Sequence, residues 1–201
     1  MIEIDSHLGI AIAGLASDAR VLSNFMKQQS LSSRLTYGRA ISLEKILSQI
    51  GERAQTNTQI YGKRPYGVGL LVAGVDDSGA HLYEFQPSGL TQEMIACAIG
   101  ARSQMARTYL EKNLDQFADS SREELIAHGL KALKETLSQN KELTTENTTV
   151  GVVGIAPPGS RNKIEPFKLY DGQDVAPLLE ALDGSSSSGE GEEGGAMEVD
   201  A

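Results

Sequence analysis

Histidine is the side chain best suited to acid–base chemistry or metal binding near neutral pH. This chain has three histidines, His7, His81 and His128, which lie far apart along the sequence. None stands in a metal-ligand spacing such as His-x-x-x-His. The pattern predicts structural or exposed histidines rather than a metal site or a catalytic base.

The other reactive residues do not form a catalytic group either. Cys97 is the only cysteine and lies in an apolar segment, residues 94–99, that predicts a short strand ending at Gly100. A buried, inert thiol is expected there rather than a nucleophile. The paired carboxylates Asp76-Asp77 and Glu123-Glu124 are typical of a turn and of a helix N-terminus. Neither a catalytic centre nor a cofactor is predicted.

The clearest structural pattern is a hairpin in residues 64–89. Residues 67–73 are apolar and uncharged, which predicts a strand buried on both faces. Its Gly67-Val68-Gly69 lacks the third glycine of a dinucleotide fingerprint and does not open a helix. Residues 76–79, Asp-Asp-Ser-Gly, predict a turn, and residues 81–85 alternate as the returning strand.

Strands and helices alternate in groups along the chain. Further strands are expected at Leu8–Gly14, which alternates large and small residues, at residues 148–155 and at Ile164–Tyr170, the last two joined by a turn at Pro157-Pro158-Gly159. Five helices are expected. The first is capped by Ser17-Asp18 and has the stripe Val21, Leu22, Phe25 and Met26; the second has Leu43, Ile46, Leu47, Ile50 and Ala54; the third has Met105, Tyr109, Leu110 and Leu114; the fourth has a Ser121–Glu124 capping box with Ile126, Leu130, Leu133 and Leu137; the last covers residues 175–182.

Helices that arrive in pairs between groups of strands predict an α+β fold, a layered αββα sandwich with helix pairs outside two stacked sheets. A doubly wound parallel sheet is the second alternative, which the failure of strict strand–helix alternation disfavours.

Composition narrows the class of protein. The chain has 201 residues, 40% hydrophobic and 5% aromatic, enough for one domain with a sizeable core. No segment approaches the roughly 20 apolar residues of a membrane span, and no secretory signal is apparent. A single cysteine fits a reducing compartment. The net charge of −9 argues against nucleic acid as the main partner.

The acidic charge is concentrated in residues 184–201. This segment is mostly Ser, Gly and Glu and contains five acidic residues and no basic one. The rest of the chain therefore has a formal net charge of −4. Such a segment buries too little apolar surface to offset the entropy of ordering, so we expect a disordered tail after a domain of residues 1–183. Solubility is its simplest role; docking or phosphorylation at Ser185 to Ser188 is the alternative.

Several segments resemble one family in the same order. They are residues 64–89, RPYGVGLLVAGVDDSGAHLYEFQPSG; residues 13–22, with Ala13-Gly14-Leu15 and Asp18-Ala19-Arg20; residues 99–111, IGARSQMARTYLE; and Tyr170-Asp171-Gly172. Together they resemble the α-type subunits of the 20S proteasome, from Met1 to about Leu182. The resemblance implies the four-layer sandwich of the N-terminal-nucleophile hydrolases.

Family members begin with an N-terminal segment, a helix and a first pair of strands, none of which this chain shows. Met1 aligns with the start of what would be the third strand, so the first strands are expected to be missing. We favour a partial gene model over a genuine truncated form, because missing strands would leave sheet edges unpaired.

The resemblance implies a non-catalytic structural subunit of the α ring, with roles in assembly, substrate gating and regulator docking in ubiquitin-dependent degradation. Implied partners are neighbouring α and β subunits and proteasome activators, in the cytoplasm and nucleus. Gly14 matches a residue lining the pocket for regulator tails; a strand-end glycine needed for backbone geometry is the alternative. The helix with Met105, Tyr109 and Leu110 matches a contact with the β ring; core packing is the alternative.

The family fold also allows two other functions. Catalysis in this fold family uses a Thr, Ser or Cys at the mature N-terminus. Residue 1 is Met, no Gly-Thr or Gly-Cys bond is present, and Gly159-Ser160 and Gly184-Ser185 lie too near the C-terminus. An active hydrolase is therefore disfavoured. A partial product that does not enter the proteasome is the other alternative.

Overall fold

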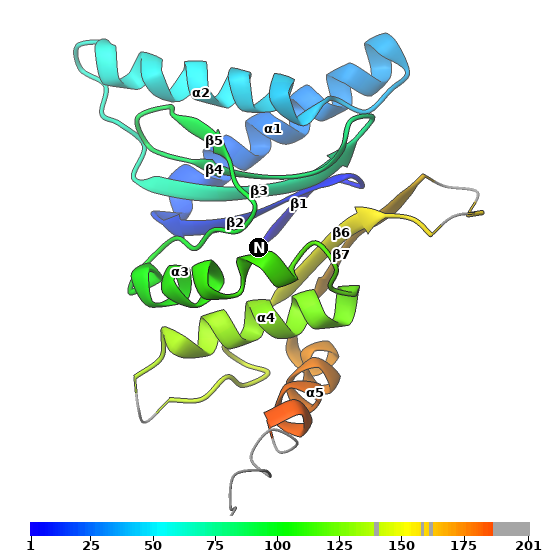
Figure 1. Ribbon diagram of the computed structural model, residues 1–201. Coiled ribbons are helices and arrows are strands. Elements are labelled where there is room, and N and C mark those ends of the chain that lie inside the picture. The colour runs from blue at the N-terminus through cyan, green and yellow to red at the C-terminus, as the bar shows by residue number, and fades with distance from the viewer. Residues whose placement is uncertain (139–140, 158, 161–162, 187–201) are drawn as a thin grey trace, which may run out of the picture.

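The computed structural model describes residues 1–138, 141–157, 159–160 and 163–186. These residues form two antiparallel sheets with helices on both sides (Figure 1). The five-stranded sheet has the order β1-β2-β3-β4-β5, and the second sheet pairs β6 with β7. The α+β sandwich is thus confirmed, and the alternative of a doubly wound parallel sheet is wrong.

The helices and strands have the following bounds along the chain: β1 (Ile2–Asp5), β2 (Leu8–Gly14), α1 (Ala16–Tyr37), α2 (Leu43–Gln59), β3 (Val68–Asp76), β4 (Gly79–Phe85), β5 (Thr91–Glu93), α3 (Ser103–Lys112), α4 (Arg122–Glu135), β6 (Val150–Ile155), β7 (Ile164–Tyr170) and α5 (Ala176–Ser186).

Helices α1 and α2 cover one face of the five-stranded sheet (Figure 1). The main core lies between them and that sheet, where Leu70 and Val72 of β3 are fully buried. All five apolar residues expected on the inner face of α2 are buried. In α1, Leu22 and Met26 are buried, but Val21 is 44% exposed, so the expected stripe is too wide.

The first helix does not begin as expected. It starts at Ala16 with Leu15 at the N-cap, and no side chain caps it. Ser17-Asp18 is therefore not the cap, because Asp18 lies in the first turn and its carboxylate binds a distant part of the chain, as described below.

The β3–β4 hairpin has the expected form, with Asp76 paired to Gly79 across the turn. The far face of β3 is only half-buried at Gly69, Leu71 and Ala73, so burial on both faces is wrong in this chain. The reason is that the second sheet has two strands, of which β6 packs on β2, β3 and β4, and two strands cannot cover five.

Two differences concern the edges of the five-stranded sheet. Strand β1 pairs with β2 at one edge. The residue pattern did not predict this strand, although the family resemblance placed the start of a strand at Met1. At the other edge β5 pairs with β4 through only three residues, and residues 94–99 are not the expected strand. The ladder ends after Met94 N donates to Leu82 O at 2.8 Å, and the chain then turns towards α3.

Helices α3, α4 and α5 lie on the side of the molecule opposite α1 and α2 (Figure 1). The capping box of α4 is confirmed: Ser121 Oγ accepts from Glu124 N, and a Glu124 carboxylate oxygen accepts from Ser121 N. Leu130 is buried, but Leu133 is 40% exposed, contrary to expectation. Arg122 joins α4 to β7 through Glu165 and the Tyr170 hydroxyl.

Parts of two expectations lie outside the described residues. Helix α5 extends to Ser186, so residues 184–186 of the expected tail are helical, while residues 187–201 lie outside the description. Pro158 of the expected Pro157-Pro158-Gly159 turn also lies outside it. In the described ranges no helix is both long and apolar enough to cross a membrane.

Candidate functional site

Gly14 occupies a position that only glycine fills without strain. It ends β2 with φ +128°, a conformation that L side chains rarely adopt. A Cβ there would lie 2.3 Å from the carbonyl oxygen of Gly67. The next residue, Leu15, donates its backbone N–H to the same oxygen at 2.8 Å. The β2–α1 junction is thus held directly against the start of β3.

Asp18 fixes the same junction from α1. Its Oδ2 accepts from Gly67 N at 2.8 Å and from Arg64 Nη1 at 2.7 Å, and its Oδ1 accepts from Arg64 Nη2 at 2.9 Å. The hydrogen bonds from Arg64, then that from Gly67, lower the pKa of Asp18 to about 2. The carboxylate is therefore ionised at neutral pH and holds the segment before β3 against α1.

Gly14 borders a hollow of about 440 Å³ whose other wall includes the first turns of α3. The loop before α3 passes close by, since a Cβ on Gly100 would touch the Cβ of Ala13 at 3.4 Å. Ser103 and Arg107 of α3 also line the hollow. The structure therefore brings Gly14 beside α3. The resemblance had implied a role for each of them, but not that they lie together.

The ionisable groups in this hollow are already paired. Arg107 Nη2 donates to Glu84 Oε1 at 3.0 Å, and Arg107 Nε donates to the carbonyl oxygen of Ala98 at 2.9 Å. Behind them the thiol of Cys97 donates to Glu84 Oε2 at 3.4 Å. Burial, followed by that bond to Glu84, raises the pKa of Cys97, so its thiol stays protonated at neutral pH. Cys97 is half-buried in a loop, so the expected buried position in a strand is wrong, and its lack of reactivity stays a prediction.

The three residues of α3 that the resemblance assigned to a β-ring contact, Met105, Tyr109 and Leu110, do not line this hollow. Met105 is 51% exposed, whereas Tyr109 and Leu110 are half-buried. The Tyr109 hydroxyl lies 3.0 Å from Nδ1 of His128 on α4, and the Phe117 ring packs edge-on against His128. Tyr109 therefore joins α3 to α4, and Met105 is the residue of the three that remains available to a partner.

Comparison with known proteins identifies the family. The model of the family described as "Proteasome subunit" matches residues 1–153. The chain belongs to the proteasome subunit family. It is 55% identical over 182 residues to the probable proteasome subunit alpha type-6 of Schizosaccharomyces pombe, covering 90% of this chain and 64% of that protein. It is 48% identical over 181 residues to proteasome subunit alpha type-6 of Saccharomyces cerevisiae, covering 89% and 74%.

A further relative is proteasome subunit alpha type-1 of Dictyostelium discoideum, 41% identical over 181 residues that cover 90% of this chain and 70% of that protein. The relatives of this proteasome-family chain are thus α-type subunits, as the sequence motifs indicated. The chain spans less than two thirds of the length of the S. pombe relative.

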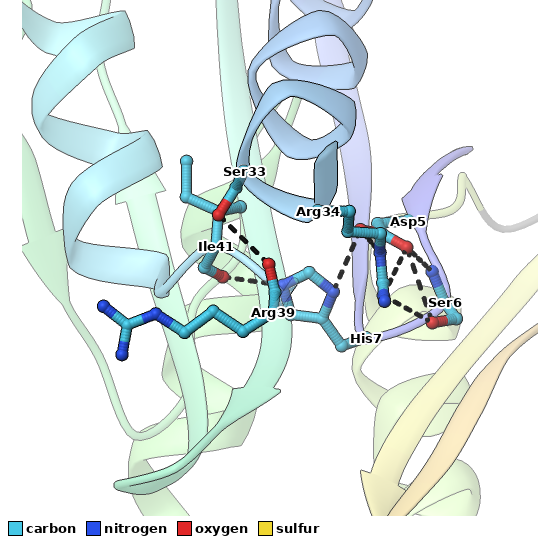
Figure 2. Close-up of polar contacts among 7 residues, drawn as sticks. All are labelled: Asp5, Ser6, His7, Ser33, Arg34, Arg39 and Ile41. Carbon is cyan, nitrogen blue, oxygen red and sulfur yellow. Dashed lines mark hydrogen bonds and ion pairs between the residues drawn. The ribbon is translucent and has the colours of Figure 1, made fainter. Parts of the chain in front are cut away.

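His7 has a structural role in this proteasome-family fold (Figure 2). It is 1% exposed, and its Nε2 donates to the carbonyl oxygen of Ile41 at 2.8 Å. Beside it, Arg34 donates two bonds of 2.8 Å to Asp5. Burial alone would raise the pKa of Asp5, but the bonds from Arg34 and Ser6 lower it below its usual value. The end of α1 is thereby tied to the β1–β2 turn.

The remaining titratable candidates have structural surroundings too. Asp76 accepts from Leu43 N at 3.2 Å, and Glu124 completes the capping box. His81 lies between the carboxylates of Asp76 and Glu93. Among the residues that the structure describes, no three His, Cys, Asp or Glu side chains are grouped as a metal site.

Sequence reasoning missed the apolar side chains on the outside of α1. Leu31 is 58% exposed, Leu35 is 78% exposed and Tyr37 is 62% exposed. Leu31 and Leu35 lie four residues apart and so share one helix face. That spacing is visible in the sequence, but the apolar stripe predicted for α1 did not include these residues.

Proposed function

We propose that this chain is a non-catalytic structural subunit of the α ring of the 20S proteasome core. The observation that carries the proposal is the 55% identity over 182 residues to an α-type proteasome subunit. The function is architectural: the chain helps to form the ring, to control substrate entry and to dock regulators in ubiquitin-dependent protein degradation. Its partners are neighbouring α and β subunits, and its location is the cytoplasm and nucleus.

Regulator docking is assigned to the hollow beside Gly14. The glycine's positive φ and its contact with Gly67 keep this corner free of a side chain. The hollow of about 440 Å³ lies next to Arg107 and the first turn of α3, with Leu15 half-exposed beside it. An activator tail placed here would meet the small residues around Gly14, the apolar side chains of Pro87 and Ile99, and the paired Glu84 and Arg107.

Contact with the β ring is assigned to α3 through Met105. Exposed methionine is suited to an apolar interface because its flexible side chain adapts to the opposing surface. Tyr109 supports this contact from behind, since its hydroxyl joins α3 to His128 of α4, and Leu110 is half-buried on the same helix. The exposed Leu31, Leu35 and Tyr37 of α1 provide a second apolar surface for neighbouring subunits.

The absence of catalysis is part of the proposal. Proteasomal proteolysis needs an N-terminal nucleophile with a free base beside it. In the described hollow, Glu84 and Arg107 neutralise each other, and the nearby Cys97 thiol stays protonated. The alternatives are an active hydrolase and a partial product that does not enter the proteasome.

Sedimentation tests the assignment. The 201-residue chain, tagged at its C-terminus and expressed in its own cells, is expected to sediment with peptidase-active core particles. A covalent probe for N-terminal threonine nucleophiles is expected to label β subunits in those fractions but not the tagged chain. Recovery of the tag only as free chain or aggregate would favour the partial product, and labelling of the chain would favour the hydrolase.

A further inference from the structure

His81 on β4 lies between two acidic residues from different elements. Its Nδ1 is 2.5 Å from Oε1 of Glu93 on the edge strand β5. Its Nε2 is 2.8 Å from Ser78 Oγ in the hairpin turn and 3.3 Å from Asp76 Oδ1 at the end of β3. Both ring nitrogens therefore have an oxygen partner.

The positions of the hydrogens follow from these partners. Ser78 Oγ is 2.5 Å from Asp76 Oδ1, and an ionised carboxylate only accepts, so the serine proton goes to Asp76. Burial alone would raise the pKa of Asp76, but the bonds from Ser78 and Leu43 lower it, so the carboxylate is ionised at neutral pH. Ser78 Oγ is left as an acceptor for Nε2, and Glu93 is an acceptor for Nδ1. With the serine proton on Asp76, both contacts are satisfied by a ring that carries a proton on each nitrogen.

The contacts continue from the edge strand to a helix. The other oxygen of Asp76 accepts from the backbone N–H of Leu43, the first residue of α2. Ser42, at the N-cap, makes no side-chain capping bond, so Asp76 supplies it instead. Hydrogen bonds thus run from Glu93 through His81, Ser78 and Asp76 to the start of α2.

The charged groups around His81 favour the doubly protonated ring. On β4, the Tyr83 hydroxyl donates to the second oxygen of Glu93 at 3.4 Å. The hollow that His81 borders is also lined by acidic Glu44 and Asp77 and by basic Arg39 and Lys45. Ile164 from β7 and Val153 from β6, which line the hollows on either side of His81, carry no charge. The hydrogen bond to Glu93, opposed by burial and aided by the charge of Asp76, raises the pKa of His81 above 6.5.

We propose that His81 is a protonation-dependent link between the edge strand β5 and the start of α2, engaged while its ring carries two protons and released when one is lost. After that loss, one ring nitrogen presents a lone pair to an oxygen acceptor. Glu93 is the side that separates, because its side chain is 54% exposed and β5 pairs through only three residues. The link does not depend on the proposed function.

The direction of the pH effect follows from the raised pKa. The stability that the link adds is fully present below about pH 6.5, the ordinary histidine value, as long as Glu93 stays ionised. This stability is lost as the pH rises through the higher pKa that His81 has in the folded chain. The edge strand is therefore held more firmly in mildly acidic solution than in mildly basic solution.

Titration of the full chain labelled with ¹⁵N-histidine tests the link. We expect the His81 midpoint to lie above 6.5 and to fall by roughly half a pH unit or more in Glu93→Gln, since an opposite charge stabilises the charged ring. Glu111→Gln, an exposed carboxylate change on α3, is the matched control and is expected to leave the midpoint unchanged. The same midpoint in Glu93→Gln and the unchanged chain would overturn the proposal.

Amide hydrogen exchange supplies a second readout, on the chain alone or within an assembled particle. After correction for intrinsic chemistry, residues 91–94 are expected to be better protected at pH 6 than at pH 8, and residues 68–74 to change little. In His81→Gln this pH difference is expected to disappear. An equal pH dependence of residues 91–94 in His81→Gln would show that the ring does not hold the strand.

Discussion

The ring of Phe167 on β7 lies directly against the α-carbon of Gly9 on β2. A Cβ on Gly9 would lie 2.0 Å from a carbon of that ring, far closer than van der Waals contact. The backbone N–H of Phe167 also donates to Ser6 O at 2.7 Å, so the ring cannot easily withdraw. The small-residue face of β2, visible in the sequence, is thus what lets the second sheet approach the first.

Substitution of Gly9 by Ala is expected to destabilise the chain by about 1–3 kcal/mol, the usual range for overpacking a filled interior. Denaturant unfolding of the full chain measures the change. Gly154→Ala on β6 is the matched control, because no atom lies within 4 Å of a Cβ there. Equal losses in the two variants would show that the Gly9–Phe167 contact has no special role.

Asp18→Asn is expected to destabilise the chain at pH 7 by roughly 1–3 kcal/mol, towards the lower end because the Arg64 guanidinium is exposed. The folded pKa of about 2 is below the ordinary 3.8, so the stability due to ionised Asp18 is present above 3.8 and lost as the pH falls towards 2. The difference between wild type and variant, measured by unfolding across this range, should therefore shrink with acid. Asp119→Asn, at an exposed aspartate, is the control. If the difference in unfolding free energy between the unchanged chain and Asp18→Asn did not vary with pH, the account would be contradicted.

Ser121→Ala is expected to cost about 0.5–2 kcal/mol, because it removes the acceptor for Glu124 N at the start of α4. Circular dichroism during thermal unfolding measures the loss. Ser48→Ala, an exposed position within α2, provides the comparison and should change stability little. If both variants unfold alike, the cap contributes nothing measurable.

Met105 and Tyr109 are expected to behave differently when altered. Met105→Gln should leave the stability of the chain nearly unchanged and reduce its incorporation into core particles several-fold, because the side chain is exposed and assigned to a partner. Tyr109→Phe should instead cost about 0.5–1.5 kcal/mol of stability through the lost bond to His128. Normal incorporation of Met105→Gln would remove α3 as the contact.

Local sequence patterns were enough to predict much of this fold. The capping box depends on Ser121 and Glu124 being three residues apart, and the hairpin turn depends on residues 76–79 alone. The inner face of α2 follows from the periodic spacing of its apolar residues. In each case the interacting residues are neighbours in sequence, so one sequence carries the whole signal.

Contacts between distant residues were not predictable in this way. Asp18 looks like a helix cap in sequence, but its carboxylate binds Arg64, 46 positions away. The apolar residues 94–99 look like a strand, but pairing at the sheet edge ends with β5. The grouping of Gly14 with Arg107 likewise depends on how α3 packs, and the resemblance to a family identified only the two regions separately.

The central claim is that the chain occupies a position in the α ring. Electron cryo-microscopy of core particles purified through a tag on this chain tests it most directly. The account predicts density for the five-stranded sheet with α1 and α2 at one α-ring position, with Met105 of α3 against the β ring and the hollow beside Gly14 open to the outer surface. Particles that lack the chain, with the tag recovered only on free protein, would contradict it.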